Sequence, residues 1–120
     1  MPTSQTIHVL VIDDDEIARE YMCDVLRKAG FVVDDIPSSI GATNRVVRDQ
    51  FHVVVIDVMM PAIRGDKLAT LLRKNPQLRS LGVVMVSGAP REELEEIGAE
   101  IDPDQVVNKA DARTKLVDAV

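Results

Sequence analysis

The sequence predicts an α/β domain in which helices cover both faces of a parallel β-sheet. Three runs are apolar and rich in β-branched residues, without the alternation of a half-exposed strand: IHVLVID at 7–13, HVVVIDV at 52–58 and GVVMVSG at 82–88. Such runs are typical of strands buried on both faces. Helical patterns separate them, and a length of 120 residues suits one compact domain spanning residues 1–120.

Two weaker strands complete the predicted sheet. FVVDDI at 31–36 and QVVNK at 105–109 are shorter and more polar than the other runs, so we expect them at the edges. Right-handed crossovers then give a (βα)5 chain whose five-stranded parallel sheet has the order 2-1-3-4-5, the flavodoxin-like doubly wound arrangement. In this order the switch point lies between the first and third strands, and ligands bind there, beyond the carboxyl ends of the strands.

Helical patterns lie between and after these strands. Five stretches are predicted to form helices: 16–30, 38–50, 65–75, 89–100 and 111–120. The first has one apolar stripe, formed by Ile17, Tyr21, Val25 and Leu26. We expect a serine, Ser38 or Ser39, to cap the second helix, because serine side chains accept hydrogen bonds from the first free N–H groups. The third helix is expected to bury three leucines, Leu68, Leu71 and Leu72.

Composition excludes several classes of protein. The formal charge of −6 and a pI of about 4.8 argue against a nucleic-acid-binding surface, which requires a basic patch. Cys23 is the only cysteine, so an intramolecular disulfide is impossible and a reducing compartment fits. No apolar run approaches the roughly 20 residues of a membrane span, and the N-terminus lacks the pattern of a signal peptide. We therefore expect a cytoplasmic protein without direct contact to nucleic acid or membrane.

Carboxylates gather where two central strands are predicted to end. Asp13 and Asp14 follow the first strand, with Asp15 next to them, and Asp57 ends the third strand. Like charges this close repel one another, and a hard divalent cation offsets the repulsion. Mg²⁺ prefers carboxylate, carbonyl and water oxygens. The sequence therefore predicts a metal site formed by Asp13, Asp14 and Asp57, whereas Asp15 is interpreted as the cap of the first helix.

The fourth and fifth predicted strands end in a hydroxyl and a cation. Ser87 ends the fourth strand and Lys109 ends the fifth. Together with the acidic cluster they form a set of groups suited to holding a phosphoryl group on a carboxylate, as covalent aspartyl-phosphate chemistry requires.

Four segments give the chain a resemblance to a known family: VIDDD, IDVMMPAIRG, VVMVSGA and VVNKAD. Over essentially its whole length the chain resembles the receiver domain of two-component response regulators, the CheY-like family. The spacings of 30 residues from Asp57 to Ser87 and of 22 from Ser87 to Lys109 fit the family pattern. The resemblance implies that Asp57 takes a phosphoryl group from a sensor histidine kinase or a histidine phosphotransfer protein, in a reaction that needs Mg²⁺ or Mn²⁺.

The resemblance also implies a role for each further residue of the site. Asp14 would be a direct metal ligand, Asp13 would act largely through water, and Met59 would add its backbone carbonyl. Ser87 and Lys109 would contact the phosphoryl oxygens, and Gly65 would permit a tight turn. Such a domain switches its surface toward a downstream protein target. It takes part in its own phosphorylation and dephosphorylation but does not turn over external substrates.

Two positions depart from the family pattern. The family commonly has an aromatic residue three positions before the lysine, and here Val106 stands there. We expect Ser87 to reorient on phosphorylation without an aromatic gate, because valine has one stiff χ1 angle and no ring. The family lysine is usually followed by proline in a cis bond, whereas Ala110 follows Lys109 here. We expect a trans bond, since a cis bond without proline costs about 3–4 kcal/mol.

Two alternatives from other classes stay open. A haloacid-dehalogenase-type phosphatase uses an Asp-x-Asp loop, and Asp13 and Asp15 have that spacing. Ile17 stands where such enzymes usually have Thr or Val, and no paired-Asp motif follows downstream. A phosphorylation-independent docking domain with a relic site is the second alternative, and the intact acidic set argues against it. Whether the chain is complete or was cut from a longer regulator is also left open.

Overall fold

The computed structural model describes residues 6–57, 65–78, 80–87 and 105–108. Its strands are β1 (His8–Ile12), β2 (Val32–Ile36), β3 (Val53–Asp57), β4 (Gly82–Ser87) and β5 (Gln105–Asn108). Its helices are α1 (Glu16–Lys28), α2 (Ala42–Asp49) and α3 (Gly65–Lys74), followed by a short 3-10 turn, η1 (Pro76–Leu78). The two helices predicted at 89–100 and 111–120 lie outside the described residues.

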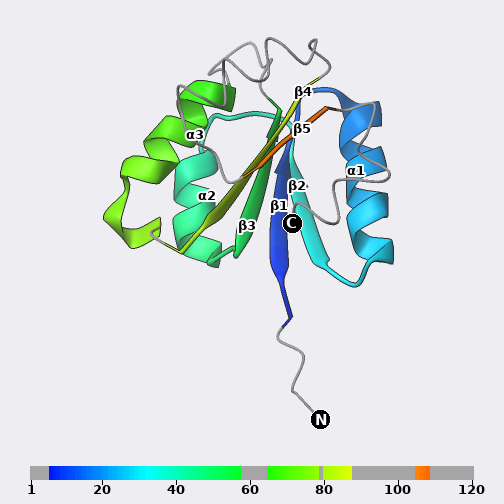
Figure 1. Ribbon diagram of the computed structural model, residues 1–120, viewed down its shortest axis with the longest axis horizontal. Coiled ribbons are helices and arrows are strands. Elements are labelled where there is room, and N and C mark those ends of the chain that lie inside the picture. Colours follow the sequence, from blue (N-terminus) through cyan, green and yellow to red (C-terminus); the bar gives the residue numbers. More distant parts are fainter. Residues whose placement is uncertain (1–5, 58–64, 79, 88–104, 109–120) are drawn as a thin grey trace.

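The strands form one parallel sheet in the order β2-β1-β3-β4-β5 (Figure 1). The predicted α/β domain with a parallel sheet is confirmed. The three apolar runs are the central strands, because each must be covered on both faces, and the two polar runs lie outside them. None of the helices in the described part of the chain has the length and apolar character that a membrane span requires.

Helices cover the sheet on opposite faces (Figure 1). On one face, α1 packs over the sheet through a cluster of buried side chains that includes Val9, Val11, Val55, Met22, Cys23 and Leu26. On the other face, α2 and α3 pack through a second cluster that includes Leu10, Ile12, Ile56, Val46, Leu68 and Leu72. The two clusters alternate along each central strand, as the period of two in a strand requires.

The predicted apolar stripe of the first helix is wrong in part. Ile17 keeps 81% of its surface exposed and Tyr21 keeps 44%, whereas Met22, Cys23 and Leu26 are buried. Residues four apart share one face of a helix, so Ile17 and Tyr21 lie together beside the buried stripe. Helical periodicity is compatible with a buried face at either set of residues. The face that packs against β1 and β2 is the one that contains Met22, Cys23 and Leu26.

The predictions for the second and third helices also need correction. No serine caps α2: the helix begins at Ala42 after Gly41, whose φ of 77° is left-handed, and Ser38 Oγ instead accepts a hydrogen bond from Ile40 N at 3.1 Å. The serine therefore stabilises the turn before the helix. In α3, Leu68 and Leu72 are buried as predicted, but Leu71 is 48% exposed. The buried face of this helix is formed by Leu68, Ala69 and Leu72, and Leu71 lies outside it.

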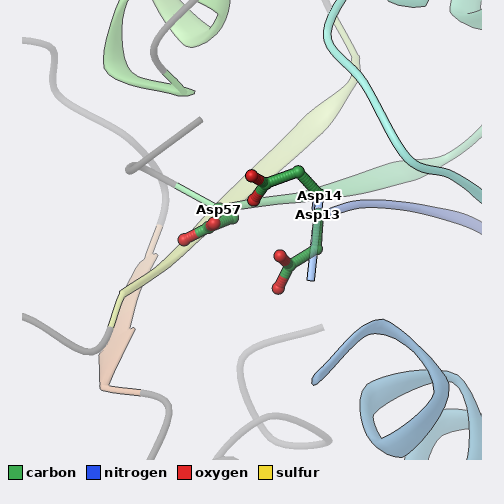
Figure 2. Close-up of side chains that lie close together, drawn as sticks. All are labelled: Asp13, Asp14 and Asp57. Atoms are coloured by element: carbon green, nitrogen blue, oxygen red, sulfur yellow. The ribbon is translucent and has the colours of Figure 1, made fainter. Parts of the chain in front are cut away.

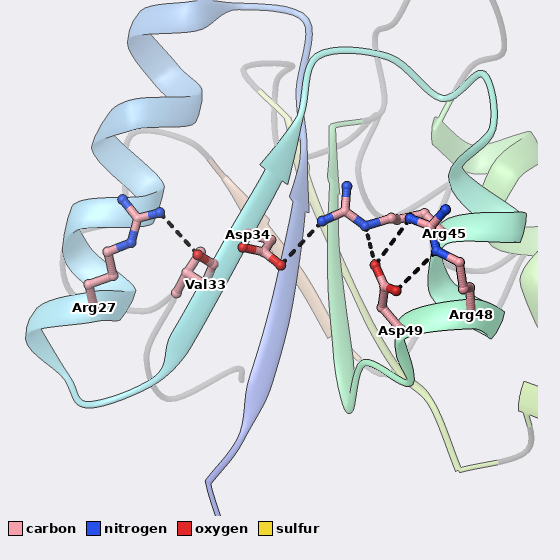
Figure 3. A network of polar contacts seen from close by, with 6 residues as sticks. All are labelled: Arg27, Val33, Asp34, Arg45, Arg48 and Asp49. Carbon is pink, nitrogen blue, oxygen red and sulfur yellow. Dashed lines mark hydrogen bonds and ion pairs between the residues drawn. The ribbon is translucent and has the colours of Figure 1, made fainter.

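The outer side of β2 is occupied by an arginine from α1. Val32 N donates to Ile7 O, so the backbone groups of Val32 point toward β1 and those of Val33 point away from it. The outward carbonyl of Val33 accepts a hydrogen bond from Arg27 Nη2 at 3.0 Å (Figure 3). This contact satisfies an edge carbonyl and blocks part of the edge from pairing with another strand.

Candidate functional site

The acidic site forms where β1 and β3 end side by side. Ile12 pairs with Ile56 in the parallel register, so the residues that follow them, Asp13 directly after β1 and Asp57 at the end of β3, lie at the same end of the sheet. Asp13, Asp14 and Asp57 each place a carboxylate oxygen within 4.8 Å of the others (Figure 2). Asp13 and Asp57 are buried, and Asp14 is exposed. The topology thus brings together the three carboxylates that the sequence predicts.

Asp15 follows this cluster in the chain, and its carboxylate caps α1. Its Oδ1 accepts hydrogen bonds from Ile17 N at 3.0 Å and Ala18 N at 3.5 Å. The cap prediction is confirmed. The backbone N–H of Asp15 donates to Asp13 Oδ1 at 2.9 Å, so the same loop also orients one of the clustered carboxylates. Of the three consecutive aspartates, Asp13 and Asp14 therefore belong to the acidic cluster, and Asp15 caps the helix.

Sequence reasoning missed one residue of this site, Arg19. Its Nη1 donates to the backbone oxygen of Asp13 at 2.8 Å, and its Nε donates to Asp35 Oδ2 at 2.7 Å. Asp13 N also donates to Ile36 O at 3.3 Å. The acidic loop is therefore attached to α1 and to β2. No local pattern in the chain signals this contact, because it depends on how β2 lies against β1.

The donors of the cluster fit a hard cation. All three are carboxylates, with no nitrogen or sulfur atom among them, and two are withdrawn from water while the third is open to it. Divalent cations such as Mg²⁺ select oxygen ligands and keep several waters, which an exposed side of the site can admit. The chemistry of the donor set therefore suits Mg²⁺ or Mn²⁺ better than a softer metal.

The remaining predicted residues are placed only in part. Ser87 is the last residue of β4, which lies beside β3 with Val86 paired to Asp57, so its backbone reaches the same edge of the sheet. Gly65 is the first residue of α3, and Val106 lies in β5 opposite Met85. Met59 and Lys109 lie outside the described residues, as does the Lys109–Ala110 bond. The predictions for these positions stay predictions.

Fold and site together define a class: a flavodoxin-like α/β domain with an acidic, oxygen-only site at the switch point of its sheet. Residues 9–120 match the family model of the response regulator receiver domain. The chain therefore belongs to the family of response regulator receiver domains, which are signalling domains of two-component systems.

Relatives and solved structures agree with this assignment. The sensory transduction protein RegX3 of Mycobacterium tuberculosis is 30% identical over 112 residues, covering 91% of this chain and 47% of RegX3. The transcriptional regulatory protein GltR of Pseudomonas aeruginosa is 26% identical over 101 residues, covering 84% of this chain and 42% of GltR. The chain thus spans less than half the length of these curated relatives.

Two solved structures illustrate the fold. The receiver domain of the Francisella response regulator 1452 has a TM-score of 0.80 at 25% identity, covering 93% of this chain and 91% of that one. The chemotaxis protein CheY4 of Vibrio cholerae has a TM-score of 0.82 at 21% identity, covering 97% of this chain and all of that one.

Proposed function

We propose that Asp57 accepts a phosphoryl group from a sensor histidine kinase or a histidine phosphotransfer protein, and that Mg²⁺ or Mn²⁺ is required. The supporting observation is the convergence of three carboxylates, with oxygens within 4.8 Å of one another, at the ends of β1 and β3. Family membership supports the same reading, because phosphorylation by a kinase is a general property of receiver domains. In this proposal the chain is a cytoplasmic switch without turnover of external substrates.

The roles of the residues follow from their chemistry. A carboxylate oxygen of Asp57 attacks the phosphorus, the bond from phosphorus to the donor's nitrogen breaks, and that nitrogen keeps the electron pair. Asp13, Asp14 and the Met59 carbonyl are the proposed companions of Asp57 in holding the metal, which when bound offsets negative charge on the phosphoryl oxygens. Ser87 and Lys109 are the proposed contacts to those oxygens, and Gly65 is the proposed turn residue after the site.

The direct test is phosphorylation by a small phosphodonor. The chain is incubated with acetyl phosphate, with and without Mg²⁺, and phosphoryl incorporation is followed by intact mass. We expect one base-labile phosphoryl group per chain, only with the metal, and none on Asp57→Asn. Incorporation into Asp57→Asn at the wild-type rate would overturn the assignment, and no incorporation into the wild type would favour the phosphorylation-independent docking domain.

Asp15→Asn is the matched control. It removes one carboxylate from the same loop but leaves an oxygen that can cap α1, since asparagine is also a favoured cap. We expect normal incorporation in this variant. The haloacid-dehalogenase-type phosphatase would need Asp15 as part of its Asp-x-Asp loop, but Asp15 is engaged as the cap and the chain belongs to the receiver family.

A further inference from the structure

Arg19 connects the acidic loop to the edge strand of the sheet. One turn into α1, its guanidinium donates to two oxygens: the backbone oxygen of Asp13 at 2.8 Å and Asp35 Oδ2 at 2.7 Å. Only 15% of the Arg19 side chain is exposed, whereas the Asp35 side chain keeps 36% exposed, so the contact with the Asp13 oxygen is the better shielded of the two. Because the guanidinium is rigid and planar, these two charge-assisted hydrogen bonds fix the position of the Asp13 oxygen relative to the Asp35 carboxylate.

The carbonyl that Arg19 holds belongs to the peptide unit between Asp13 and Asp14. A peptide unit is planar, so a hydrogen bond at its oxygen restrains the plane that leads to the Asp14 Cα. Asp13 is also restrained by its own N–H, which donates to Ile36 O, and the next peptide unit, between Asp14 and Asp15, is restrained because the Asp15 N–H donates to the Asp13 carboxylate. Arg19 therefore restrains one of the two peptide units that flank Asp14, whose exposed carboxylate belongs to the cluster, and the Asp15 N–H restrains the other.

We propose that Arg19 is a positioning residue for the acidic site, and that Asp35 on β2 is its anchor. Arg19 fixes the direction from which Asp14 offers its carboxylate to a divalent cation. This inference rests on the proposed function of the cluster as a metal site. Residues that orient the ligands of a metal typically change metal affinity about 10–100-fold when they are mutated, without contacting the metal themselves.

The chain offers a matched control for this proposal. Arg45 of α2 binds Asp34, the residue next to Asp35, with Arg45 Nη2 at 3.2 Å from Asp34 Oδ2. This pair also joins a flanking helix to β2, but Arg45 contacts Asp34, Asp49 and the ring of Phe51, and none of these residues is in the acidic loop. A purely structural effect of losing an arginine–aspartate pair should therefore appear in both variants.

The experiment measures Mn²⁺ affinity without a phosphodonor, by water-proton relaxation, at a temperature where every variant is folded by circular dichroism. We expect Arg19→Ala to bind Mn²⁺ roughly 10-fold more weakly than the wild type, Arg45→Ala to bind as the wild type does, and Arg19→Lys to fall between them. Wild-type affinity in Arg19→Ala, or equal losses in Arg19→Ala and Arg45→Ala, overturns the role of Arg19. Absence of Mn²⁺ binding to the wild type overturns the metal site itself, and the role of Arg19 with it.

A second readout needs no metal. Because the Asp15 N–H donates to Asp13 Oδ1, its hydrogen exchange reports the order of the loop. We expect faster exchange at Asp15 in metal-free Arg19→Ala and unchanged exchange there in Arg45→Ala. Unchanged exchange in Arg19→Ala would show that the loop keeps its geometry without the arginine and would overturn the proposal.

Discussion

Two arginine–aspartate pairs attach β2 to the helices on opposite faces of the sheet, and they differ in what else each arginine reaches. Arg19 binds Asp35 and the backbone oxygen of Asp13, where the acidic site begins. Arg45 binds Asp34 and, on its other side, Asp49 (Figure 3). The same pairing chemistry thus supports the candidate site on one face and the attachment of a helix on the other.

The register of β2 decides which aspartate serves which face. Asp35 pairs with Val11, which packs in the cluster under α1, and Asp34 pairs with Leu10, which packs in the cluster under α2 and α3. Adjacent residues of a strand point to opposite faces, so a shift of one residue would exchange the two roles. Position in the sheet, and not residue type, therefore separates Asp35, on the side of the acidic loop, from Asp34, on the side of α2.

The largest expected effect is on phosphorylation, and it comes from a change in the acidic loop, which Arg19 contacts and Arg45 does not. Asp14→Asn removes a carboxylate from the cluster without changing its size, so we expect metal dependence and phosphoryl uptake to be lost together. Intact mass after incubation with acetyl phosphate over a range of Mg²⁺ concentrations measures both. Arg45→Ala should be phosphorylated as the wild type is. Normal, metal-dependent uptake by Asp14→Asn would show that the metal assignment is wrong.

Replacing each aspartate of β2 by asparagine in turn tests whether the two faces differ. In Asp35→Asn the amide oxygen can still accept from Arg19, but the bond loses its charge assistance. We expect Mn²⁺ affinity to fall about 3-fold, less than the roughly 10-fold loss expected for Arg19→Ala. Asp34→Asn should leave the affinity unchanged. The relaxation titration used for Arg19 measures both variants, and equal effects of the two substitutions would remove the distinction between the faces.

On the α2 face the expected effect is on stability. Arg45 lies with its guanidinium carbon 5.8 Å from the centroid of the Phe51 ring and pairs with the half-exposed Asp34. Arg45→Ala should reduce the free energy of unfolding by about 1 kcal/mol, and added salt should reduce the part due to ion pairing. Urea unfolding at low and high salt measures this. A loss above about 3 kcal/mol would mean that Arg45 supports more of the fold than these contacts do.

The effect that is smallest at neutral pH concerns Cys23 on the α1 face, where burial, followed by the negative charge of Asp35, raises the thiol pKa from 9.0 to about 11. The folded state therefore disfavours the thiolate. The stability due to the neutral thiol is present below pH 9 and is lost as the pH rises toward 11.

Thermal unfolding of the wild type and Cys23→Ala between pH 8 and pH 11 isolates this contribution. We expect the wild type to lose more stability over that range than the variant does, because alanine cannot ionise. In the Asp35→Asn background the difference in stability loss between Cys23 and Cys23→Ala should be smaller, whereas in the Asp34→Asn background it should be unchanged. Parallel pH curves for the wild type and Cys23→Ala would contradict the prediction.

Much of the fold and of the candidate site could be predicted because the signals are local. Apolar runs without alternation identify buried strands, and an aspartate directly after such a run must lie at the carboxyl edge of a parallel sheet. That is why Asp13, Asp14 and Asp57 were found together as expected. The cap at Asp15 is equally local, since its carboxylate binds N–H groups two and three residues ahead.

The faces of the helices could not be predicted to the same degree. The exposed pair Ile17 and Tyr21 and the buried set Met22, Cys23 and Leu26 both satisfy helical spacing. Leu71 likewise fits an apolar stripe but is half-exposed, while the smaller Ala69 is buried. Hydropathy describes what a side chain prefers, whereas burial depends on the sheet surface against which the helix lies.

The alternation of strands and helices and the placement of acids at the strand ends are encoded in the sequence, because both follow from residues close together in the chain. The contacts of Arg19 with Asp35, 16 residues away, and of Arg45 with Asp34 arise only in the folded chain. These contacts depend on the register of β2 against β1 and on the rotation of each helix over the sheet. Both are set by packing between distant segments, which the local patterns of the chain do not encode.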